Sequence, residues 1–338
     1  MTTTQVLPTT ALGADGARVG VQGFGAMGIS EFYGASDLVE SRATLEKALE
    51  LGVTLFDTAD MYGSGHNEEF VGEFVRANRE NVVLATKFGL VRKAEDPRYR
   101  GIDNSPEYIR RAVDASLRRL GIDVIDLYYM HRKQPGVPVE ETVGVMAELV
   151  AQGKIRQVGL SEVTGAELRA AHAVYPIAAV QSEWSLFSRD VERTVVPAAV
   201  ELGITFVPYS PLGRGFLTGT IVPGSIPLEG DVRHGFPRLS GDNAARNIEL
   251  LAPLRAIAEA RGITLAQVAL AWVHARAGVH ELSVAPIPGT RSRTRLAENV
   301  AAATIVLTAD ELAALEPIAT QVSGDRYVDM NFTQAGRE

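Results

Sequence analysis

Eight short apolar runs, each rich in β-branched residues, recur along the 338-residue chain and are separated by longer segments with helical periodicity. The runs lie at residues 19–25, 53–57, 82–87, 124–130, 155–160, 177–182, 204–209 and 282–287. Nearly continuous apolar character is typical of strands covered on both faces, as in parallel sheets. Eight strand–helix units of roughly 30 residues predict a TIM barrel, an α/β fold that typically needs about 250 residues. A doubly wound open sheet is the alternative.

The connecting segments carry helix start and stop signals. Asp37 or Ser36 is expected to cap a helix that ends near Gly52, and Ser105 begins a helix that ends at Gly121. Further helices are predicted at roughly 67–78, 139–152, 165–174, 189–202, 247–261 and 291–302, with an extra terminal helix at 310–321.

Two segments exceed what a bare barrel needs. Residues 6–18 are expected to form an N-terminal hairpin that turns near Asp15-Gly16. Residues 212–245 are rich in glycine, proline and polar side chains, and their length predicts a loop or lid at a site. No linker or shift in composition divides the chain, so residues 1–338 are expected to form one domain.

Composition disfavours several classes of function. The chain has no cysteine, which excludes disulfides, thiolate catalysis and zinc–cysteine sites. A formal net charge of -8 disfavours binding to nucleic acids or membrane surfaces, because both require a basic face. The chain shows no signal-peptide pattern, no apolar stretch of roughly 20 residues and no H-E-x-x-H or G-x-S-x-G motif. We therefore expect a cytoplasmic protein without a metal.

Three of the apolar runs lead into a titratable side chain. Asp57 and Lys87 each end a run, His131 follows another, and Tyr62 lies in the loop after Asp57. Because parallel α/β folds build their sites at the carboxyl ends of strands, these four side chains are expected to meet at the barrel mouth. Taken singly, each has a structural explanation: a loop-capping Asp, a packing Tyr, a snorkelling Lys or a structural His.

Together the four side chains favour carbonyl reduction. A phenol has an unperturbed pKa near 10, and a nearby ammonium such as that of Lys87 is expected to lower the pKa of Tyr62. Asp57 would keep Lys87 charged. Tyr62 could then act as general acid toward an oxygen that gains negative charge, while His131 hydrogen-bonds the same oxygen. Such a group suits a hydride arriving from a nicotinamide cofactor.

A glycine motif offers a second, different indication. Residues 23–28 match G-x-G-x-x-G after an apolar run, which taken alone suggests a Rossmann dinucleotide site. That motif requires a helix to open at once, and no helical period is apparent before about Leu38. The alternative is that these glycines let the first strand turn tightly beneath a ligand.

The segments around the four side chains closely resemble the signatures of the aldo-keto reductase family, in particular its bacterial reductases of aldehydes and pyridoxal. The resemblance covers residues 57–63 with Asn67-Glu68, then 85–87, 128–132, 157–161, 180–183, 209–215 and 286–291, in the family's order. It implies a TIM barrel that binds NADPH/NADP+ in an extended form and interconverts aldehydes or ketones with alcohols. It also implies that Tyr62 is the general acid and that Asp57, Lys87 and His131 complete a catalytic tetrad.

The resemblance also assigns cofactor contacts. Ser161 and Gln181 are expected to hold the nicotinamide amide, and Tyr209 to stack on its ring. The remaining contacts are Ser210, Leu212 and Arg214 at the pyrophosphate, Gly289, Thr290, Arg291 and Arg295 at the adenosine phosphate, Glu298 and Asn299 at the adenine, and Met27 beside the cofactor. The arginines near residue 291 cluster at a helix start, where guanidinium groups and the helix N-terminus both favour a phosphate. The alternative for this cluster is a solvated basic face.

Two positions depart from the family's pattern. Glu162 stands where many members carry an Asn that contacts the nicotinamide amide, and Trp184 stands where members often carry Tyr. Both are nevertheless assigned to the site, Glu162 to the cofactor and Trp184 to the substrate pocket. The other pocket residues are Phe24, Phe32 and Tyr33, which indicate an apolar or aromatic substrate.

Other functions remain open at this point. Lys87 could form a Schiff base as in an aldolase, although Asp57 should keep it protonated. A regulatory subunit that binds cofactor with little turnover is a further alternative. The expected partner is a small-molecule carbonyl substrate; its identity, self-association into a homo-oligomer and the choice of NADPH over NADH are left open.

Overall fold

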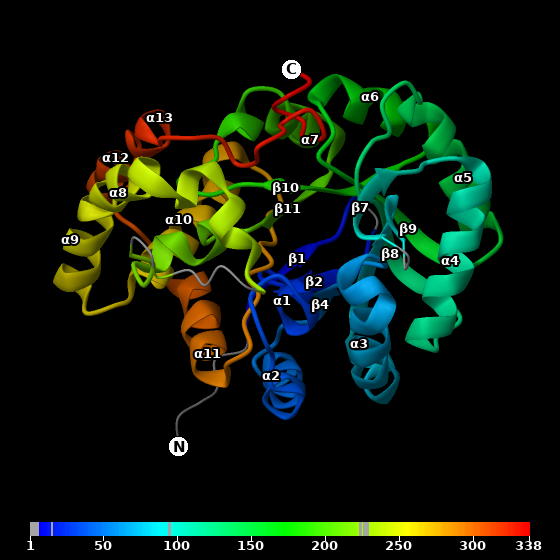
Figure 1. Ribbon diagram of the computed structural model, residues 1–338, viewed down its shortest axis with the longest axis horizontal. Helices are drawn as coiled ribbons and strands as arrows, with labels where there is room; N and C mark the ends of the chain where they lie inside the picture. Colours follow the sequence, from blue (N-terminus) through cyan, green and yellow to red (C-terminus); the bar gives the residue numbers. More distant parts are fainter. Residues whose placement is uncertain (1–6, 15, 94–95, 223–224, 226–229) are drawn as a thin grey trace.

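Seven parallel strands form the central sheet of the computed structural model, which describes residues 7–14, 16–93, 96–222, 225 and 230–338 (Figure 1). In sheet order they are β11 (Thr205–Tyr209), β10 (Ile177–Glu183), β9 (Ile155–Ser161), β8 (Ile125–Met130), β5 (Val83–Phe88), β4 (Leu55–Asp57) and β3 (Phe24–Gly25). Neighbouring strands in this order are parallel throughout. The carboxyl ends of these strands therefore share one edge.

The eighth apolar run closes the sheet into a barrel. Its backbone exchanges hydrogen bonds with Phe206 of β11 on one side, and Pro286 accepts one from Gly23 on the other, at 2.9 Å. Only a single bridge, Phe206 with Val284, is regular enough to count as pairing. Proline lacks an N–H, so Pro286 and Pro288 shorten the ladder here. The predicted α/β barrel is confirmed.

The first apolar run, by contrast, is divided between two strands. Its beginning is β2 (Arg18–Gly20), which pairs antiparallel with β1 (Thr9–Ala11), and only its end is β3. The predicted N-terminal hairpin is therefore present, although Asp15 lies outside the described residues. Gly13 donates its N–H to Thr205 Oγ1 at 2.8 Å at the start of β11, so the hairpin covers the amino-terminal end of the barrel.

The glycine motif lets two barrel segments approach each other closely and does not form a Rossmann turn. A Cβ on Gly25 would lie 2.8 Å from the carbonyl oxygen of Ile287, and one on Gly289 would lie 2.4 Å from that of Gly25. The two segments thus approach more closely than any side chain allows. The expectation that no helix begins before about Leu38 is wrong, because a one-turn helix, α1 (Met27–Ser30), opens within the motif. The strand before it, however, belongs to a barrel sheet.

Helices surround the barrel and mostly follow the predicted ranges. They are α2 (Leu38–Glu50), α3 (His66–Ala77), α4 (Pro106–Leu120), α5 (Val139–Ala151), α6 (Gly165–Val174), α7 (Val195–Leu202), α9 (Ala252–Arg261), α11 (Arg293–Ala301), α12 (Ala309–Leu315) and α13 (Ile318–Gln321). Asp37 caps α2, and Ser105 caps α4, which ends at the left-handed Gly121 as predicted. Short 3-10 turns, η1 (Tyr62–Gly65), η2 (Arg79–Asn81), η3 (Asp190–Glu192) and η7 (Ala302–Thr304), join these elements.

Several elements differ from the predictions. α10 (Leu265–His280) was not predicted, because it is apolar on most sides and shows no amphipathic period. The hairpin of β6 (Leu90–Lys93) and β7 (Asp96–Ile102) also lacked a signal. Within the predicted 212–245 loop lie η4 (Gly213–Thr218), η5 (Val232–Gly235) and η6 (Pro237–Leu239), and α8 (Gly241–Glu249) begins before the loop was expected to end.

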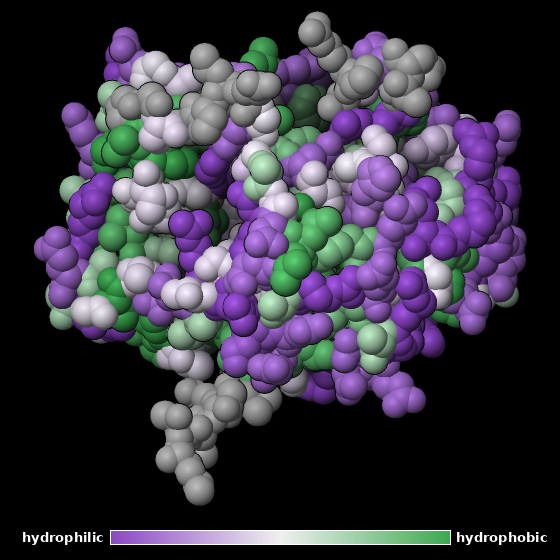
Figure 2. Space-filling model, turned by 60° about the horizontal axis from the view of Figure 1, so that its bottom comes forward, coloured by the Kyte–Doolittle hydropathy of each residue, from purple (hydrophilic) through white to green (hydrophobic). Residues whose placement is uncertain are grey.

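The core has two layers. One lies inside the barrel and includes Leu55, Leu127 and Tyr129, together with Leu12 and Val19 from the hairpin. A larger one lies between the sheet and the surrounding helices. On the face drawn in Figure 2, hydrophilic surface surrounds separate apolar patches. In the described part of the chain no single helix is long and apolar enough to span a membrane, and the one pair that passes on length and composition, α9 with α10, is bent by 99°.

Candidate active site

The four predicted catalytic side chains come from three adjacent strands. Asp57 ends β4, Lys87 lies in β5, His131 directly follows β8, and Tyr62 begins η1 after β4. The ladder aligns these ends, since Asp57 pairs with Ala85, and His131 N donates to Phe88 O at 2.8 Å. Backbone register therefore brings all four to the carboxyl edge of the barrel, as predicted.

The Lys87 ammonium is the centre of this group. Its Nζ forms an ion pair with Asp57 Oδ1 and donates to Thr58 O at 2.7 Å and to the Tyr62 hydroxyl at 3.5 Å. The other Asp57 oxygen accepts a hydrogen bond from Gln181 Nε2 at 2.8 Å. Lys87 is 0% exposed, and all three donor directions of its ammonium face these partners. This arrangement disfavours a Schiff base, which requires a free, neutral amine.

Tyr62 and His131 complete the cluster. Their rings meet edge-on with centroids 5.9 Å apart, and both side chains are nearly buried, at 7% and 6% exposure. Phe32 packs edge-on against the other side of Tyr62, at 6.3 Å. His131 Nδ1 is buried without a hydrogen-bond partner among the described residues. Such unsatisfied buried polar atoms are rare in folded proteins and can mark a catalytic role.

Burial is the largest cause of the pKa changes in these four side chains. Burial, with the neighbouring Arg132 and Lys87 charges, lowers the pKa of His131 well below its usual 6.5, so the imidazole is neutral at pH 7. Burial raises the pKa of Asp57 and lowers that of Lys87, and their contact opposes both changes. We take the pair as ionised, because each charge is hydrogen-bonded at close range.

The expected lowering of the Tyr62 pKa is not found. Burial and the Asp57 charge raise the pKa of Tyr62 well above 10, and only Arg132 opposes them appreciably. The main reason is burial, which disfavours the charged phenolate, and the negative charge of Asp57 acts in the same direction. Tyr62 therefore stays protonated at neutral pH, which is the form a proton donor needs.

Backbone strain is concentrated around this mouth. Positive φ angles occur at Phe32 (78°), Ser64 (55°), Glu162 (52°), Ser210 (47°) and Arg214 (57°), all in loops that follow barrel strands. Non-glycine residues rarely adopt this conformation, and such strain clusters at functional sites. Two of the five, Ser210 and Arg214, are predicted pyrophosphate contacts, and Glu162 is the unusual residue of the nicotinamide region.

Glu162 is held by the far end of the chain. Its carboxylate accepts from Arg326 Nη1 at 3.1 Å and Nη2 at 3.3 Å, from the Tyr209 hydroxyl at 2.7 Å and from the Gln334 N–H at 3.1 Å. Glu162 and Arg326 are 0% and 1% exposed. Burial alone would raise the pKa of Glu162, but Arg326, Arg132 and the Tyr209 hydroxyl lower it to about 2.

The segment at residues 322–338, called here the C-terminal segment, crosses the mouth toward α6 and α7 (Figure 1). Tyr327 lies beside the Tyr209 hydroxyl at 3.2 Å and over Arg214, and Phe332 lies 5.9 Å from the Arg132 guanidinium. Sequence reasoning missed this segment. Its only signal was two aromatic residues and two arginines after the last predicted helix.

Comparison with known proteins agrees with this geometry. A sequence model of the aldo/keto reductase family matches residues 23–320. The chain belongs to the aldo/keto reductase family. This membership confirms the resemblance and the predicted oxidoreductase class.

Solved reductases and dehydrogenases share the whole fold. The glycerol dehydrogenase of Gluconobacter oxydans is 26% identical over 97% of this chain and 99% of its own, with a TM-score of 0.81. A holo aldo-keto reductase of Bacillus halodurans is 27% identical over 96% and 100%, at 0.74. One from Klebsiella pneumoniae, solved with NADP and acetate, is 30% identical over 94% and 98%, at 0.69.

In this aldo/keto reductase, the residues predicted to contact the nicotinamide lie together. Ser161 Oγ accepts from Arg132 Nη1 at 3.3 Å, Gln181 reaches Asp57, and Tyr209 reaches Glu162. Met27 packs with Phe32 against Tyr62. In the next loop, Gly213 N donates to Ser210 O at 2.8 Å and Gly215 N to Leu212 O at 3.0 Å. These hydroxyl, amide and aromatic groups fit a nicotinamide and its ribose.

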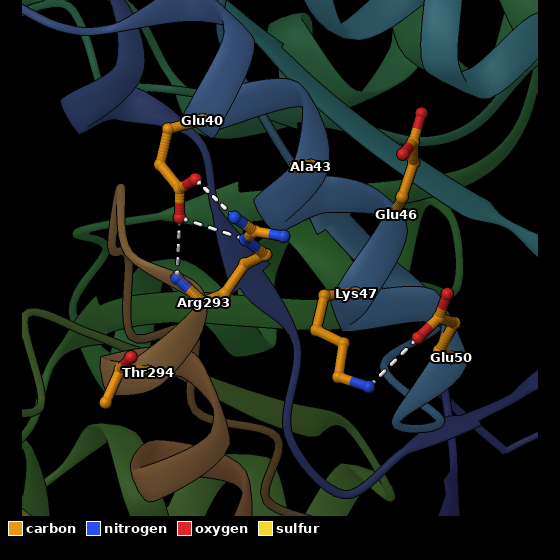
Figure 3. Close-up of a pocket in the computed structure, with 7 residues that line it drawn as sticks. All are labelled: Glu40, Ala43, Glu46, Lys47, Glu50, Arg293 and Thr294. Atoms are coloured by element: carbon orange, nitrogen blue, oxygen red, sulfur yellow. Dashed lines mark hydrogen bonds and ion pairs between the residues drawn. The ribbon is translucent and has the colours of Figure 1, made fainter.

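At the adenosine end, the three arginines have different surroundings. Arg291 binds the carbonyl oxygens of residues 33–35, and Arg293 forms an ion pair with Glu40 beside a cavity between α2 and α11 (Figure 3). Arg295 is exposed and, among the described residues, forms no ion pair. The Ser292 side chain caps α11, Thr290 Oγ1 accepts from Ser292 N, and Gln267 binds Glu298 O next to the buried Asn299. Arg295 at this helix start fits a phosphate, whereas the Arg293 charge is already matched by Glu40.

The predicted substrate pocket is only partly assembled. Phe32 contacts Tyr62, and Tyr33 lies under Arg233 near the mouth. Phe24, however, packs on Phe56 in the layer between sheet and helices. Trp184 packs on Phe206 and His280 in the same layer, and its indole donates to Glu192. These two side chains fill the core and do not meet Tyr62.

Proposed function

We propose that this protein is an NADPH-dependent reductase that interconverts aldehydes or ketones and alcohols. The observation that carries the proposal is the contact of the Lys87 ammonium with both Asp57 and the Tyr62 hydroxyl. The Tyr62 ring in turn lies edge-on to the His131 ring. The family membership and the NADP-bound Klebsiella relative support the choice of cofactor. When bound, the reduced nicotinamide supplies the hydride.

The side chains of this protein supply the rest. Tyr62, protonated at neutral pH, donates its proton to the oxygen that gains charge during reduction. Neutral His131 donates a ring N–H to the same oxygen and orients the carbonyl group. Lys87 compensates the charge that remains on Tyr62, and Asp57 with Gln181 holds the ammonium in place. In the reverse direction Tyr62 takes the proton from the alcohol.

Other residues bind the cofactor in this proposal. Ser161 and Gln181 hold the nicotinamide amide, Tyr209 lies against the ring, and the strained loop at 210–214 carries the pyrophosphate. The start of α11, with Thr290 and Arg295, holds the adenosine phosphate. Residues 1–338 act as one domain, with 212–245 as its site loop, in a cytoplasmic enzyme.

Replacing Tyr62 by phenylalanine tests the assignment directly. We expect the rate of aldehyde-dependent NADPH oxidation to fall by at least 10²-fold, because a positioned general acid contributes roughly 10²–10⁴ in rate. Cofactor affinity, measured by fluorescence titration, should change little. The matched control is Tyr175→Phe, at the end of α6 and away from the mouth. Undiminished reduction by Tyr62→Phe would refute the proposed acid.

A further inference from the structure

The cations around the barrel mouth differ in how their charges are matched. Lys87 pairs with Asp57, Arg214 with Glu183 at 2.8 Å, and Arg326 with Glu162 at 3.1 Å. Arg132 differs from these three cations: it is 6% exposed and forms no ion pair within the described ranges. The Glu162 charge compensates part of the Arg132 charge without a direct contact, because Arg132 contributes to the low pKa of Glu162. A buried guanidinium that no anion contacts directly is still costly, since burial of a charge is tolerated mainly when it is paired.

The geometry of Arg132 shows which edge is free. Its Nη1 is anchored, because it donates to His131 O at 2.7 Å and Ser161 Oγ at 3.3 Å. Its Nε is buried without an acceptor, and Nη2 has none among the described residues. Nε and Nη2 share one edge of the guanidinium plane, and a carboxylate fits that edge with two parallel hydrogen bonds.

The neighbouring carboxylate does not satisfy this edge. Glu162 directs its oxygens to Arg326, Tyr209, and the N–H groups of Glu183 and Gln334. Its acceptor capacity is therefore largely filled by groups other than Arg132.

The position of Arg132 is that of a substrate contact. It directly follows His131, and its guanidinium lies 6.0 Å from the Tyr209 ring and 5.9 Å from the Phe332 ring. Its charge also acts on Tyr62 and His131. A ligand anion bound here would lie on the same side of the barrel as the proposed proton donor, near the aromatic rings of Tyr209 and Phe332.

We propose that Arg132 is a specificity-determining residue that binds an anionic group, in particular a carboxylate, on the carbonyl substrate. This rests on the proposed reductase function and deepens it, because it names the substrate class as aldehydes or ketones that carry a carboxylate. Binding at the Nε–Nη2 edge fixes the distance between the carboxylate and the reacting carbonyl. The remaining question for experiment is whether the anion belongs to the substrate or to a cofactor phosphate.

The test compares 4-carboxybenzaldehyde with its neutral methyl ester in the full-length enzyme with NADPH. We expect the native enzyme to favour the carboxylate in kcat/KM by roughly tenfold or more, the effect of a charge-assisted pair. Arg132→Gln should remove this preference, mainly by raising KM for the carboxylate substrate. The kcat values for the two substrates should change by the same factor, because the lost charge acts on Tyr62 and His131 whichever substrate is bound. Arg132→Lys should keep part of the preference. Arg169→Gln, which removes an equal charge from the exposed pair with Glu201, should leave the preference unchanged.

Two outcomes overturn the inference. In the first, the ratio of kcat/KM between the two aldehydes survives in Arg132→Gln; a higher NADPH dissociation constant in that variant would then assign the anion to the cofactor. In the second, kcat/KM falls equally for both substrates. If neither aldehyde is reduced by the native enzyme, the proposed function fails instead. Benzoate binding, followed by tryptophan fluorescence in the native and Arg132→Gln proteins, then decides the anion site separately: equal affinities would reject it.

Discussion

Replacing Glu162 by glutamine removes one charge from the buried pair with Arg326 while it keeps the size of the side chain. The fall in the pKa of Glu162 from 4.5 to about 2 sets the magnitude. At 1.36 kcal/mol per pH unit, this corresponds to about 3 kcal/mol of stabilisation at pH 7. That figure agrees with the roughly 3–5 kcal/mol lost when one partner of a buried pair is removed.

The effect should appear first in the C-terminal segment, because Arg326 is the residue that ties it to the barrel. About 3 kcal/mol corresponds to a roughly 10²-fold larger opening equilibrium. Amide hydrogen exchange of peptides from residues 324–338 should accelerate by about that factor in Glu162→Gln, while peptides from β8 stay protected. Arg326→Met and the double variant complete a cycle whose coupling energy should be about 2 kcal/mol or more.

The dependence on pH has a definite sign. The folded-state pKa of Glu162 lies below its unfolded value, so its stabilisation is fully present above about pH 4.5 and is lost as pH falls toward about 2. The native enzyme and Glu162→Gln should therefore converge in acid. Equal exchange rates in the two proteins at pH 7, or an additive double variant, would refute the view that this pair fastens the segment.

Two further predictions concern the tetrad and the helices. Burial and Asp57 raise the pKa of Tyr62 well above 10, so the protonated phenol persists at neutral and mildly basic pH. We therefore expect kcat for reduction to stay constant from roughly pH 6 to 9. A loss of kcat with an apparent pKa in that range would contradict this prediction. Gly144 in α5 has free space where a methyl group would lie, so Gly144→Ala should stabilise the protein by roughly 0.5–1 kcal/mol in urea unfolding. Gly72→Ala should instead destabilise the protein by about 1–3 kcal/mol, since the added Cβ would lie 2.6 Å from Leu120 O. If both alanine variants change the free energy of unfolding equally, close packing between α3 and α4 does not explain the effect of Gly72→Ala.

The barrel and the tetrad could be predicted because both follow from local pattern. Apolar runs mark parallel strands, and parallel strands present their carboxyl ends on one edge, so Asp57, Lys87 and His131 had to converge once the fold was right. This prediction required no knowledge of contacts between residues far apart in the sequence. The phenol of Tyr62 follows the same logic, because the loop that carries it begins at Asp57.

Features that depend on distant contacts or on uniform burial could not be read in this way. α10 has no polar face, so its period is hidden although the helix is long. The lowering of the Tyr62 pKa was inferred from Lys87 alone, whereas burial of the phenol and the Asp57 charge determine the direction of the change. Trp184 and Phe24 were assigned to the pocket from their position near motifs, but strand alternation points them to the helix layer.

One departure from the family's pattern and the unpredicted C-terminal segment are the same structural feature. A glutamate at residue 162 puts a charge where many members have a neutral amide, and a buried carboxylate requires a cation. That cation is Arg326, 164 positions away, and it brings Tyr327 and Phe332 with it over the mouth. Glu162 thus connects the chain terminus to the barrel mouth, where the proposed cofactor contact Tyr209 also binds it. A neutral residue at 162 would leave Arg326 without its main partner, so the two positions should be exchanged together or not at all.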